Sequence, residues 1–280
     1  MNKLLIIDGH NYLYRAYYGV PSAAQLPNGI QINAFYGFFS CLRKNIRNIN
    51  PNNIIVVFDS ETGIQNKIEV KNNYKQNRDY SDTGMFEQLP IIKKALEYIG
   101  INYVEDSTNE GDDVIGSIAY KASSNKEVYI STQDQDFFQL ITEKISVLRD
   151  ERVLNPKTNK NIYNPVIYTE ESFKRKRKFP PQNYLDYIAL KGDPSDNIVG
   201  VEGIGKVRAS KLVIQNGDID KIIENSKEKR LIGKEQLIRE NKIFLRISTD
   251  LDIKYNLSAF DNKKLFASSN EILKALEYTD

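Results

Sequence analysis

The stretch Lys3-Leu4-Leu5-Ile6-Ile7-Asp8 decides the fold, because a continuous apolar run there ends in a carboxylate. The same pattern returns in Ile54-Ile55-Val56-Val57-Phe58-Asp59, and in Val128-Tyr129-Ile130-Ser131-Thr132, which lies just before two further aspartates. Continuous β-branched runs of this kind are typical of strands that are buried on both faces. We therefore expect parallel strands whose carboxyl ends carry acidic side chains.

Helical patterns separate these runs, at 34–46, 89–99 and 112–122. The alternation of strands and helices predicts an α/β fold with a mostly parallel central sheet flanked by helices. From 145 to 168 the pattern changes to strand-like pieces on both sides of Asn155-Pro156-Lys157-Thr158-Asn159, which indicates a hairpin.

Beyond residue 169 the sequence is helical in character. We expect helices at four places and one more in the tail: 181–190, 206–215, 219–225, 234–246 and a helix after Asp261. In our interpretation the chain divides into an α/β core at 1–168 and a helical region at 169–280.

The bulk composition excludes little by itself. Lys and Arg total 39 against 37 Asp and Glu, and a net charge of +2 does not indicate whether the partner is a nucleic acid. The single cysteine, Cys41, cannot form an internal disulfide, which is compatible with a reducing cytoplasm. No run approaches the roughly 18 apolar residues of a membrane helix, and the apolar run near Met1 is too short for a signal peptide and is followed by charge. We expect a cytoplasmic protein without a membrane partner.

Acidic residues gather at the predicted carboxyl ends of the strands, which is where open α/β sheets bind their ligands. Any one of them could be only a turn former or a helix N-cap. Taken together they are candidate ligands on one rim of the sheet: Asp8, Asp59, Glu110, Asp112, Asp113, Asp134, Asp136, Asp193 and Asp196. The alternative is a set of unrelated caps and turns.

Like charges in such a group repel one another, and cations are needed to neutralise them. Ligation by oxygen selects hard cations, so we expect Mg²⁺, with Mn²⁺ as a substitute. Zinc is disfavoured because one His and one Cys provide no zinc cluster. Two divalent ions about 4 Å apart form the usual clamp for phosphodiester hydrolysis. The sequence therefore predicts a two-metal nuclease.

A glycine hairpin at 201–212 leads into a helix, with Gly203 and Gly205 in its turn. Glycines let a ligand approach the backbone closely, and exposed amides at the start of a helix favour phosphate. Three cations in the following turns would strengthen this attraction: Lys206, Arg208 and Lys211. The segment is similar to the start of a Walker A loop, but Val207 stands where that motif needs Ser or Thr. An ordinary tight turn between two helices is the remaining alternative.

Two polar segments are open to a plain solvent-facing interpretation. Residues 71–87 have little apolar periodicity and interleave aromatic and basic side chains: Tyr74, Lys75, Arg78 and Tyr80. The basic run 174–178 is typical of a solvated face, although it adds to the attraction for phosphate. His10, the only histidine, is interpreted as a hydrogen-bonding residue rather than a general base.

A series of short motifs follows one another in the chain: Ile7-Asp8-Gly9-His10, Val57-Phe58-Asp59, Tyr74-Lys75-Gln76-Asn77-Arg78, Glu110-Gly111-Asp112-Asp113, Thr132-Gln133-Asp134-Gln135-Asp136, 192–197 and 200–206. Together and in this order they resemble the 5′-nuclease (flap endonuclease) superfamily. The resemblance runs from Leu4 to about Arg246. It is strongest to the 5′–3′ exonuclease domain of bacterial DNA polymerase I and to the stand-alone phage 5′ nucleases.

The resemblance implies a PIN-like or resolvase-like core and a division of the carboxylates between two metal ions. The first ion would lie among Asp8, Asp59, Glu110 and Asp112, with Asp113 beside them. The second would lie among Asp134, Asp136, Asp193 and Asp196. The implied activity is 5′–3′ exonuclease and structure-specific 5′-flap endonuclease cleavage of DNA, in replication and repair.

The resemblance also implies two DNA-binding elements. A helical arch at about 71–95 would admit a single-stranded 5′ end, with Lys75 and Arg78 on the scissile phosphate and Tyr74 beside them on the DNA. A helix-hairpin-helix element at about 181–216 would grip duplex backbone and bind K⁺. The implied partner is DNA with a 5′ end, a flap or a single-strand/duplex junction.

Departures from the family pattern are small. Gly111 stands where Ala is more usual, which costs a little helix stability, and Gln135 stands where Lys or Gly is common. Since 280 residues leave no room for a polymerase domain, any polymerase partner would be a separate chain, and we expect a monomer.

Two other functions are a DNA-binding module without nuclease activity and a PIN-type ribonuclease. The complete acidic set argues against the first, and the glycine hairpin argues against the second.

Overall fold

A mostly parallel sheet forms the centre of the computed structural model, which describes residues 2–21, 24–60, 84–154, 156, 158–159, 161–257 and 259–279. The strand order is β3-β2-β1-β4-β5-β6, and every neighbouring pair is parallel except β5 and β6. The strands are β1 (Lys3–Asp8), β2 (Asn53–Asp59), β3 (Asn102–Asp106), β4 (Glu127–Ser131), β5 (Ile145–Leu154) and β6 (Asn161–Tyr168). The predicted fold class is confirmed.

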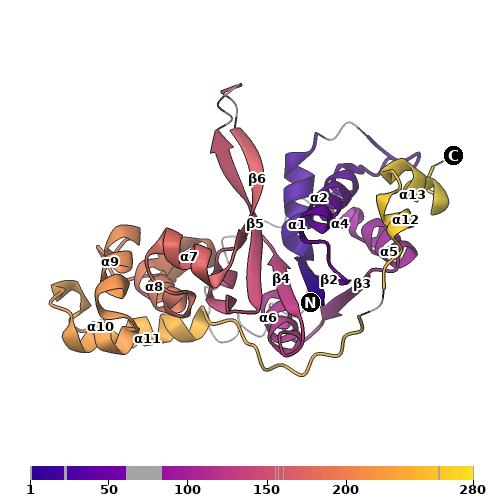
Figure 1. Cartoon of the computed structure of the whole chain (residues 1–280). Helices are drawn as coiled ribbons and strands as arrows, with labels where there is room; N and C mark the ends of the chain where they lie inside the picture. Colours follow the sequence, from indigo (N-terminus) through magenta and orange to yellow (C-terminus); the bar gives the residue numbers. More distant parts are fainter. Residues whose placement is uncertain are drawn as a thin grey trace.

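Alternate residues of the central strands face two separate hydrophobic cores. Leu5 and Ile7 of β1 pack in one core with α1 (Gly9–Gly19), α2 (Asn33–Ile49) and α5 (Leu89–Ile99). Leu4 and Ile6 pack in the other with α6 (Gly111–Ala122) and the 3-10 helix η1 (Asp136–Leu140). Helices therefore cover both faces of the sheet (Figure 1), which explains why β1 and β2 are unbroken apolar runs.

The helical region continues one of these cores. It consists of α7 (Glu170–Arg177), η2 (Pro181–Asn183), α8 (Tyr184–Lys191), α9 (Lys206–Asn216), α10 (Ile219–Asn225), η4 (Lys229–Leu231) and α11 (Glu235–Phe244). Buried residues of α7, α8, α9 and α11 belong to the same cluster as α6 and β4: Phe173, Tyr184, Leu212 and Ile238. The region lies at one edge of the sheet (Figure 1), so its side chains can reach the carboxyl ends of the strands.

The tail returns to the opposite side of the sheet. Residues 246–257 cross from α11 toward the first helices (Figure 1). The tail then forms two short helices, α12 (Asn262–Phe266) and α13 (Ser269–Ala275), where the sequence predicts a single one. Ser268 causes the break, because its hydroxyl caps α13 by accepting the Glu271 N–H at 3.2 Å. Leu265 and Ile272 are buried beside α2 and α5.

Part of the range predicted as an arch has another role. Residues 84–95 belong to α4 (Gly84–Glu87) and α5, and Ile91, Ile92 and Ala95 are fully or almost fully buried against the sheet. The apolar periodicity that predicts α5 at 89–99 therefore takes precedence over the arch assignment for these residues. Residues 71–83 lie outside the described part of the chain. None of the helices that the structure describes is long and apolar enough to cross a membrane.

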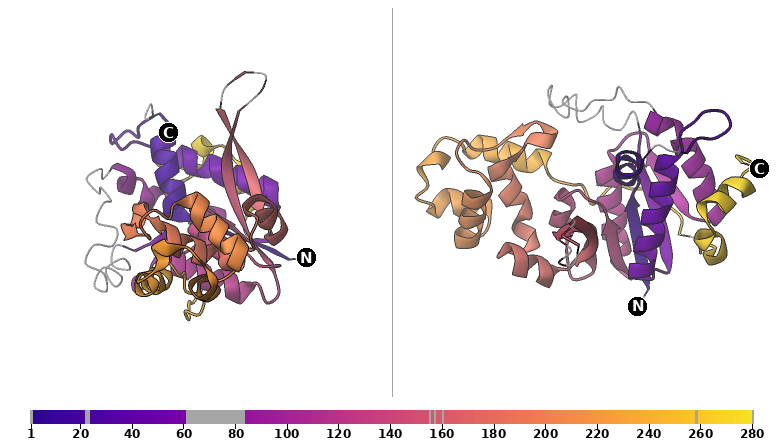
Figure 2. Two further views of the ribbon diagram at one scale, coloured as in Figure 1. Left: turned by 90° about the vertical axis from the view of Figure 1, so that its left-hand side faces the viewer. Right: turned by 90° about the horizontal axis from the view of Figure 1, so that it is seen from above.

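A two-stranded arm projects from the sheet. The last parallel pair of β4 and β5 joins Ser131 to Leu148, and beyond it β5 pairs only with β6, out to Leu154. The arm therefore extends past the carboxyl edge of the sheet (Figures 1 and 2). Asp150 fixes its base, because its carboxylate accepts from Arg15 of α1 at 2.7 Å and from Lys44 of α2 at 2.8 Å. Burial by itself raises the pKa of Asp150, but these two cations outweigh it and lower that pKa.

We predict that Asp150→Ala lowers the free energy of unfolding by about 2 kcal/mol at neutral pH, since hydrogen bonds to charged groups contribute about 1.5–3 kcal/mol and both cations stay partly solvated. A lowered folded pKa means that the contribution is complete above the unfolded pKa of about 3.9 and is lost as the pH falls through the folded pKa. Urea unfolding of both proteins at pH 7 and pH 3 should therefore give a smaller difference at pH 3.

Asp252→Ala is the control for this ion pair. Its carboxylate is 94% exposed and 3.9 Å from Lys121, so its removal should change stability very little. Equal losses in the Asp150 and Asp252 variants, or a difference that does not depend on pH, would contradict the role given to Asp150.

Candidate active site

The carboxyl edge of the sheet is where the predicted carboxylates lie. Asp8 ends β1 and caps α1, because its Oδ1 accepts the Asn11 N–H at 3.1 Å. Its side chain is only 8% exposed. The strand rule therefore places Asp8 correctly, and the helix that follows it begins at Gly9, where no helix is predicted from the sequence.

Thr132, just past the end of β4, links Asp8 to the next carboxylate. Its hydroxyl donates to Asp8 Oδ2 at 2.6 Å and accepts from the Asp134 N–H at 3.0 Å. Asp134 Oδ1 in turn accepts the Asp136 N–H at 2.8 Å. One chain of hydrogen bonds therefore joins the strand end at Asp8 to both aspartates after β4. Sequence reasoning missed Thr132, whose position between a strand and a turn was the available signal.

The pKa of Asp8 shows that neighbouring carboxylates influence its ionisation. Its pKa is raised to about 7, chiefly by burial and also by the charges of Asp59 and Asp134, against the hydrogen bonds from Thr132 and Asn11 that lower it. A carboxyl group that is half protonated near neutral pH has too little positive charge around it. A bound cation would supply that charge and lower the pKa.

Asp59 is held by a backbone amide and a histidine. Its Oδ1 accepts the Gly111 N–H at 2.8 Å, and its own N–H donates to His10 Nδ1 at 2.8 Å. Burial lowers the pKa of His10, so the ring is neutral at physiological pH and carries its proton on Nε2. His10 thus has the hydrogen-bonding role that the sequence indicates, with Asp59 as its partner.

The departure at Gly111 has a steric reason. A Cβ at this position would lie 2.5 Å from Asp59 Oδ1, which real side chains do not tolerate. Glycine has a lower helix propensity than alanine, but it allows the backbone amide to approach Asp59 closely. Its neighbours Glu110, which is buried at the N-cap of α6, and Asp112, in the first turn, lie at the same helix start.

A cavity of about 400 Å³ gathers three more of the predicted carboxylates, Asp134, Asp136 and Asp193. It is lined by residues from both the α/β core and the helical region: Asn11, Gln133, Asp134, Gln135, Asp136, Arg177, Tyr184, Tyr187, Lys191, Asp193, Ser195 and Lys206. Burial raises the pKa of Asp136 well above its usual value, and so do the charges of Asp134, Asp193 and Asp196, against Lys191. The two halves of the predicted acidic set therefore meet at Asp134, which influences both Asp8 and Asp136.

The loop that carries Asp193 and Asp196 is compact. It contains β7 (Gly192–Asp193), η3 (Pro194–Asp196) and β8 (Ile198–Val199), with β7 and β8 paired in antiparallel fashion. Asp193 Oδ1 accepts two hydrogen bonds from Ser195, one from its N–H at 2.9 Å and one from its hydroxyl at 2.6 Å. The aspartates thus come from a short turn after α8, as the sequence indicates.

Asp113 is oriented differently from its neighbours. Its buried carboxylate accepts the Ser248 N–H at 2.8 Å and so contacts the segment that leads from α11 to the tail. Among the described residues, no group of three or more His, Cys, Asp or Glu side chains converges closely enough to enclose an ion. The predicted DNA contacts Tyr74, Lys75 and Arg78 lie outside the described residues.

The glycine hairpin forms an exposed turn at the start of α9. Gly203 has a left-handed φ of 73°, and Gly205 is the N-cap of α9. A Cβ at Gly205 would meet nothing within 4 Å, whereas one at Gly203 would lie 2.8 Å from Arg230 Nε. Arg208 braces the turn by donating to Gly203 O at 2.6 Å.

The cations predicted around the hairpin are distributed between two surfaces. Lys206 lines the cavity of Asp134 and Asp136, while Arg208 and Lys211 lie exposed on α9. Arg177 and Lys191 also line the cavity, and the sequence did not single them out for this site. Carboxylate oxygens beside lysines and an arginine form a site that suits hard cations together with a phosphate group.

Comparisons with known proteins identify the family of the chain. The chain matches the family described as 5'-3' exonuclease, N-terminal resolvase-like domain, over residues 3–178, and that described as 5'-3' exonuclease, C-terminal SAM fold, over 179–267. A 5'-3' exonuclease of Aquifex aeolicus is 31% identical and covers 99% of this chain and 92% of its own length. DNA polymerase I of Bacillus subtilis is 31% identical over 92% of this chain and 29% of the polymerase.

A solved structure shares the fold over nearly the whole chain. The bacteriophage T5 flap endonuclease, in a pseudo-enzyme-product complex with DNA and metal ions, superposes with a TM-score of 0.66 at 20% identity. The match covers 99% of this chain and 100% of the phage protein. At this identity the likeness concerns the fold.

Thr132→Val should raise the pKa of Asp8 above its value of about 7 in the metal-free protein, because the variant keeps the volume of the side chain and removes the hydrogen bond that lowers this pKa. Carbon-13 NMR of labelled aspartate carboxyls, followed against pH, measures it. Thr108→Val is the matched control, since that hydroxyl donates at 2.9 Å to Asp106, an aspartate that is only partly buried. A titration of Asp8 near pH 4 in the wild type would refute the account of its burial.

Proposed function

Because the chain belongs to the 5′–3′ exonuclease family and is a hydrolase of DNA phosphodiesters, we propose that its carboxyl-edge carboxylates hold two divalent cations for this reaction. The observation that carries the proposal is electrostatic. Burial raises the pKa values of both Asp8 and Asp136, and the charges of the carboxylates around them raise these values as well. Such a cluster is stable in its charged form when cations neutralise it.

The proposal assigns the carboxylates to two ions. Asp8, Asp59, Glu110 and Asp112 would hold the first ion, with Asp113 behind them, and Asp134, Asp136, Asp193 and Asp196 would hold the second. The donor set consists of oxygens, which fits Mg²⁺, and Mn²⁺ as a substitute. When bound, the pair supplies an activated water and stabilises the leaving oxygen. The phage relative was solved with metal ions, which supports this assignment.

Residues of the chain orient the carboxylates of that site and neutralise the charge of a bound phosphate. Thr132 fixes Asp8, and the Gly111 amide fixes Asp59. Lys191, Lys206 and Arg177 line the cavity beside the carboxylates, where they attract a phosphate and balance its charge. Lys75 and Arg78 are proposed to contact the scissile phosphate, with Tyr74 on the same DNA strand.

The substrate proposed is DNA with a 5′ end, a flap or a single-strand/duplex junction. The glycine hairpin would hold duplex backbone through its amides and bind K⁺, with Lys206, Arg208 and Lys211 beside it. We also propose a cytoplasmic monomer that works beside a separate polymerase chain, since one relative joins the same region to DNA polymerase I. The division at residues 168 and 169 between core and helical region belongs to the same proposal.

The function is tested by cleavage of a labelled 5′-flap DNA and its RNA counterpart, with and without Mg²⁺. Asp196→Ala should raise the Mg²⁺ concentration for half-maximal single-turnover cleavage, and part of the rate should return at high Mg²⁺, since ligand number sets affinity. Asp59→Ala should be harder to rescue, because the first ion activates the attacking water in this proposal.

Asp250→Ala removes an exposed carboxylate from the tail segment and is the control, with the Mg²⁺ dependence of the wild type expected. A wild-type protein that binds flap DNA without cutting it would be a DNA-binding module. Preferential cleavage of the RNA would indicate a PIN-type ribonuclease. An Asp196→Ala enzyme with unchanged Mg²⁺ dependence would remove the loop from the metal site.

Gly205→Ala should weaken binding to blunt duplex DNA several-fold in a filter-binding titration without divalent metal. The added methyl group meets no protein atom within 4 Å, so it occupies only the space that a phosphate would need. Gly19→Ala, another position open to solvent, should leave binding unchanged. If both variants bind like the wild type, the hairpin is only a turn between two helices.

A further inference from the structure

The loop that presents Asp193 and Asp196 has a narrow neck. Gly192 pairs with Val199, and Val201 N donates to Leu190 O at 2.9 Å. Gly192 and Gly200 pack so tightly that a Cβ on Gly200 would lie 2.2 Å from the Lys191 carbonyl carbon, and one on Gly192 would lie 2.3 Å from Gly200 N. The two ends of the loop are therefore in direct backbone contact.

Asn241 of α11 bridges these two ends. Its side-chain amide donates to Ala189 O, at the end of α8, at 3.1 Å and to Val199 O, in β8, at 2.8 Å. The residue is 1% exposed. Both partners are carbonyl oxygens, so the amide nitrogen must face them, and both of its protons are used. One buried side chain thus ties the strand after the aspartate loop to the helix before it.

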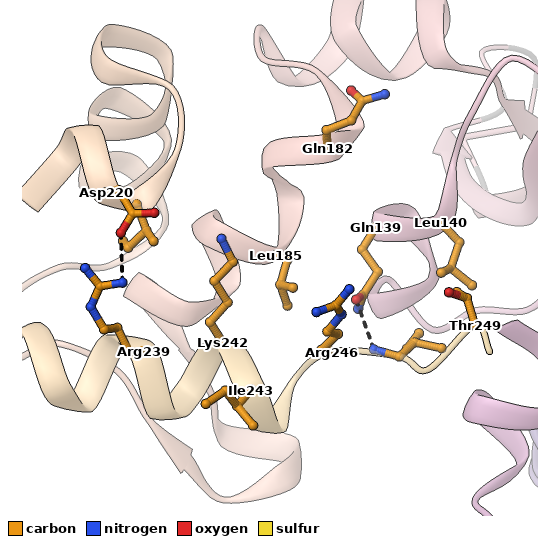
Figure 3. Close-up of a pocket in the computed structure, with 12 residues that line it drawn as sticks. Gln139, Leu140, Gln182, Leu185, Asp220, Arg239, Lys242, Ile243, Arg246 and Thr249 are labelled. Carbon is orange, nitrogen blue, oxygen red and sulfur yellow. Dashed lines mark hydrogen bonds and ion pairs between the residues drawn. The ribbon is translucent and has the colours of Figure 1, made fainter. Parts of the chain in front are cut away.

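The helix that carries Asn241 is itself fixed. The next residue, Lys242, forms an ion pair of 2.5 Å with the buried Asp186 of α8, and Arg239 forms one of 2.8 Å with Asp220 of α10. Lys242 and Arg239 lie along a second cavity, of about 650 Å³, between α11, α8 and α10 (Figure 3). Asn241 therefore acts from a firmly held support.

The loop needs such support because its charges repel the rest of the site. Asp193 and Asp196 both raise the pKa of Asp136 across the cavity. Repulsion of this kind favours a wider loop, and a metal site weakens when its ligands must be drawn together on binding. The two hydrogen bonds of Asn241 to the ends of the loop would keep the loop closed before a cation binds.

We propose that Asn241 is a positioning residue that sets the affinity of the second cation site by holding the loop of Asp193 and Asp196 in place. The inference rests on the proposed function, which makes these two aspartates metal ligands. What it adds is that a buried side chain on α11, which is not one of the proposed metal ligands, controls how tightly the loop binds metal.

The experiment measures metal binding without DNA, by following free Mn²⁺ with electron paramagnetic resonance. Asn241→Leu keeps the side-chain volume and removes both donors. It should weaken the weaker class of Mn²⁺ sites by about 10-fold, which corresponds to about 1.4 kcal/mol, and leave the number of sites and the tighter class unchanged. In single-turnover cleavage, the Mg²⁺ requirement should rise while the rate at saturating Mg²⁺ stays near that of the wild type.

Asn33→Leu is the matched control. Asn33 is also a buried asparagine, 3% exposed, whose amide donates to two backbone carbonyls, Tyr17 O at 2.7 Å and Val20 O at 3.1 Å. It lies in the other core, so its variant should lose stability without a change in Mn²⁺ affinity. Equal weakening in both variants, or none in Asn241→Leu, would overturn the proposal.

Asp196→Ala separates this inference from the proposed function. If Asp196→Ala loses the weaker Mn²⁺ site while Asn241→Leu keeps it, the positioning role fails and the metal assignment survives. If Asp196→Ala binds Mn²⁺ like the wild type, the metal assignment fails first. Should circular dichroism show that Asn241→Leu is unfolded, Asn241→Ser, which keeps one donor in a smaller side chain, decides the question by the same titration.

Discussion

The constraint on which the rest of the structure depends is the gathering of carboxylates at one buried edge of the sheet. Asp8 ends a strand that is buried on both faces, so water screens its charge poorly. Hydrogen bonds from Asn11 and Thr132 offset part of the cost, yet its pKa is still raised to about 7. A cluster that opposes its own ionisation gains most from cations, which ties the stability of this edge to its function.

Contacts between distant parts of the chain hold the elements around this edge in place. Asp150 fixes the projecting arm to α1 and α2, and Asp113 fixes the segment after α11 through the Ser248 amide. Asn241 ties the loop of the last two aspartates to α11. Each contact joins parts of the chain that lie far apart in sequence. The helical region and the α/β core thus share one site as well as one continuous hydrophobic core.

The sequence predicts what depends on local pattern and cannot predict what depends on distant partners. Helices at 89–99 and 219–225 coincide with α5 and α10 because apolar periodicity and turn residues are local signals. Asp8 and Asp59 are predicted at strand ends because apolar runs that stop at a carboxylate are a local signal, and both residues do end their strands. The position of Thr132 between a strand and a turn marks it only as a candidate, because its partner Asp8 is 124 residues away in the sequence. The arch range extended into α5 because a polar segment has no period that marks its end.

At Gly111 the helix and the acidic site favour different residues. Helix propensity favours alanine at the start of α6 by up to about 1 kcal/mol. A methyl group there would lie 2.5 Å from Asp59 Oδ1 and push that carboxylate away from the Gly111 amide, which it now meets at 2.8 Å. The chain gives up helix stability and keeps a hydrogen bond to an ionised group, which is worth about 1.5–3 kcal/mol. The hydrogen bond fixes the orientation of the Asp59 carboxylate at the carboxyl edge of the sheet, where the proposed first cation would bind.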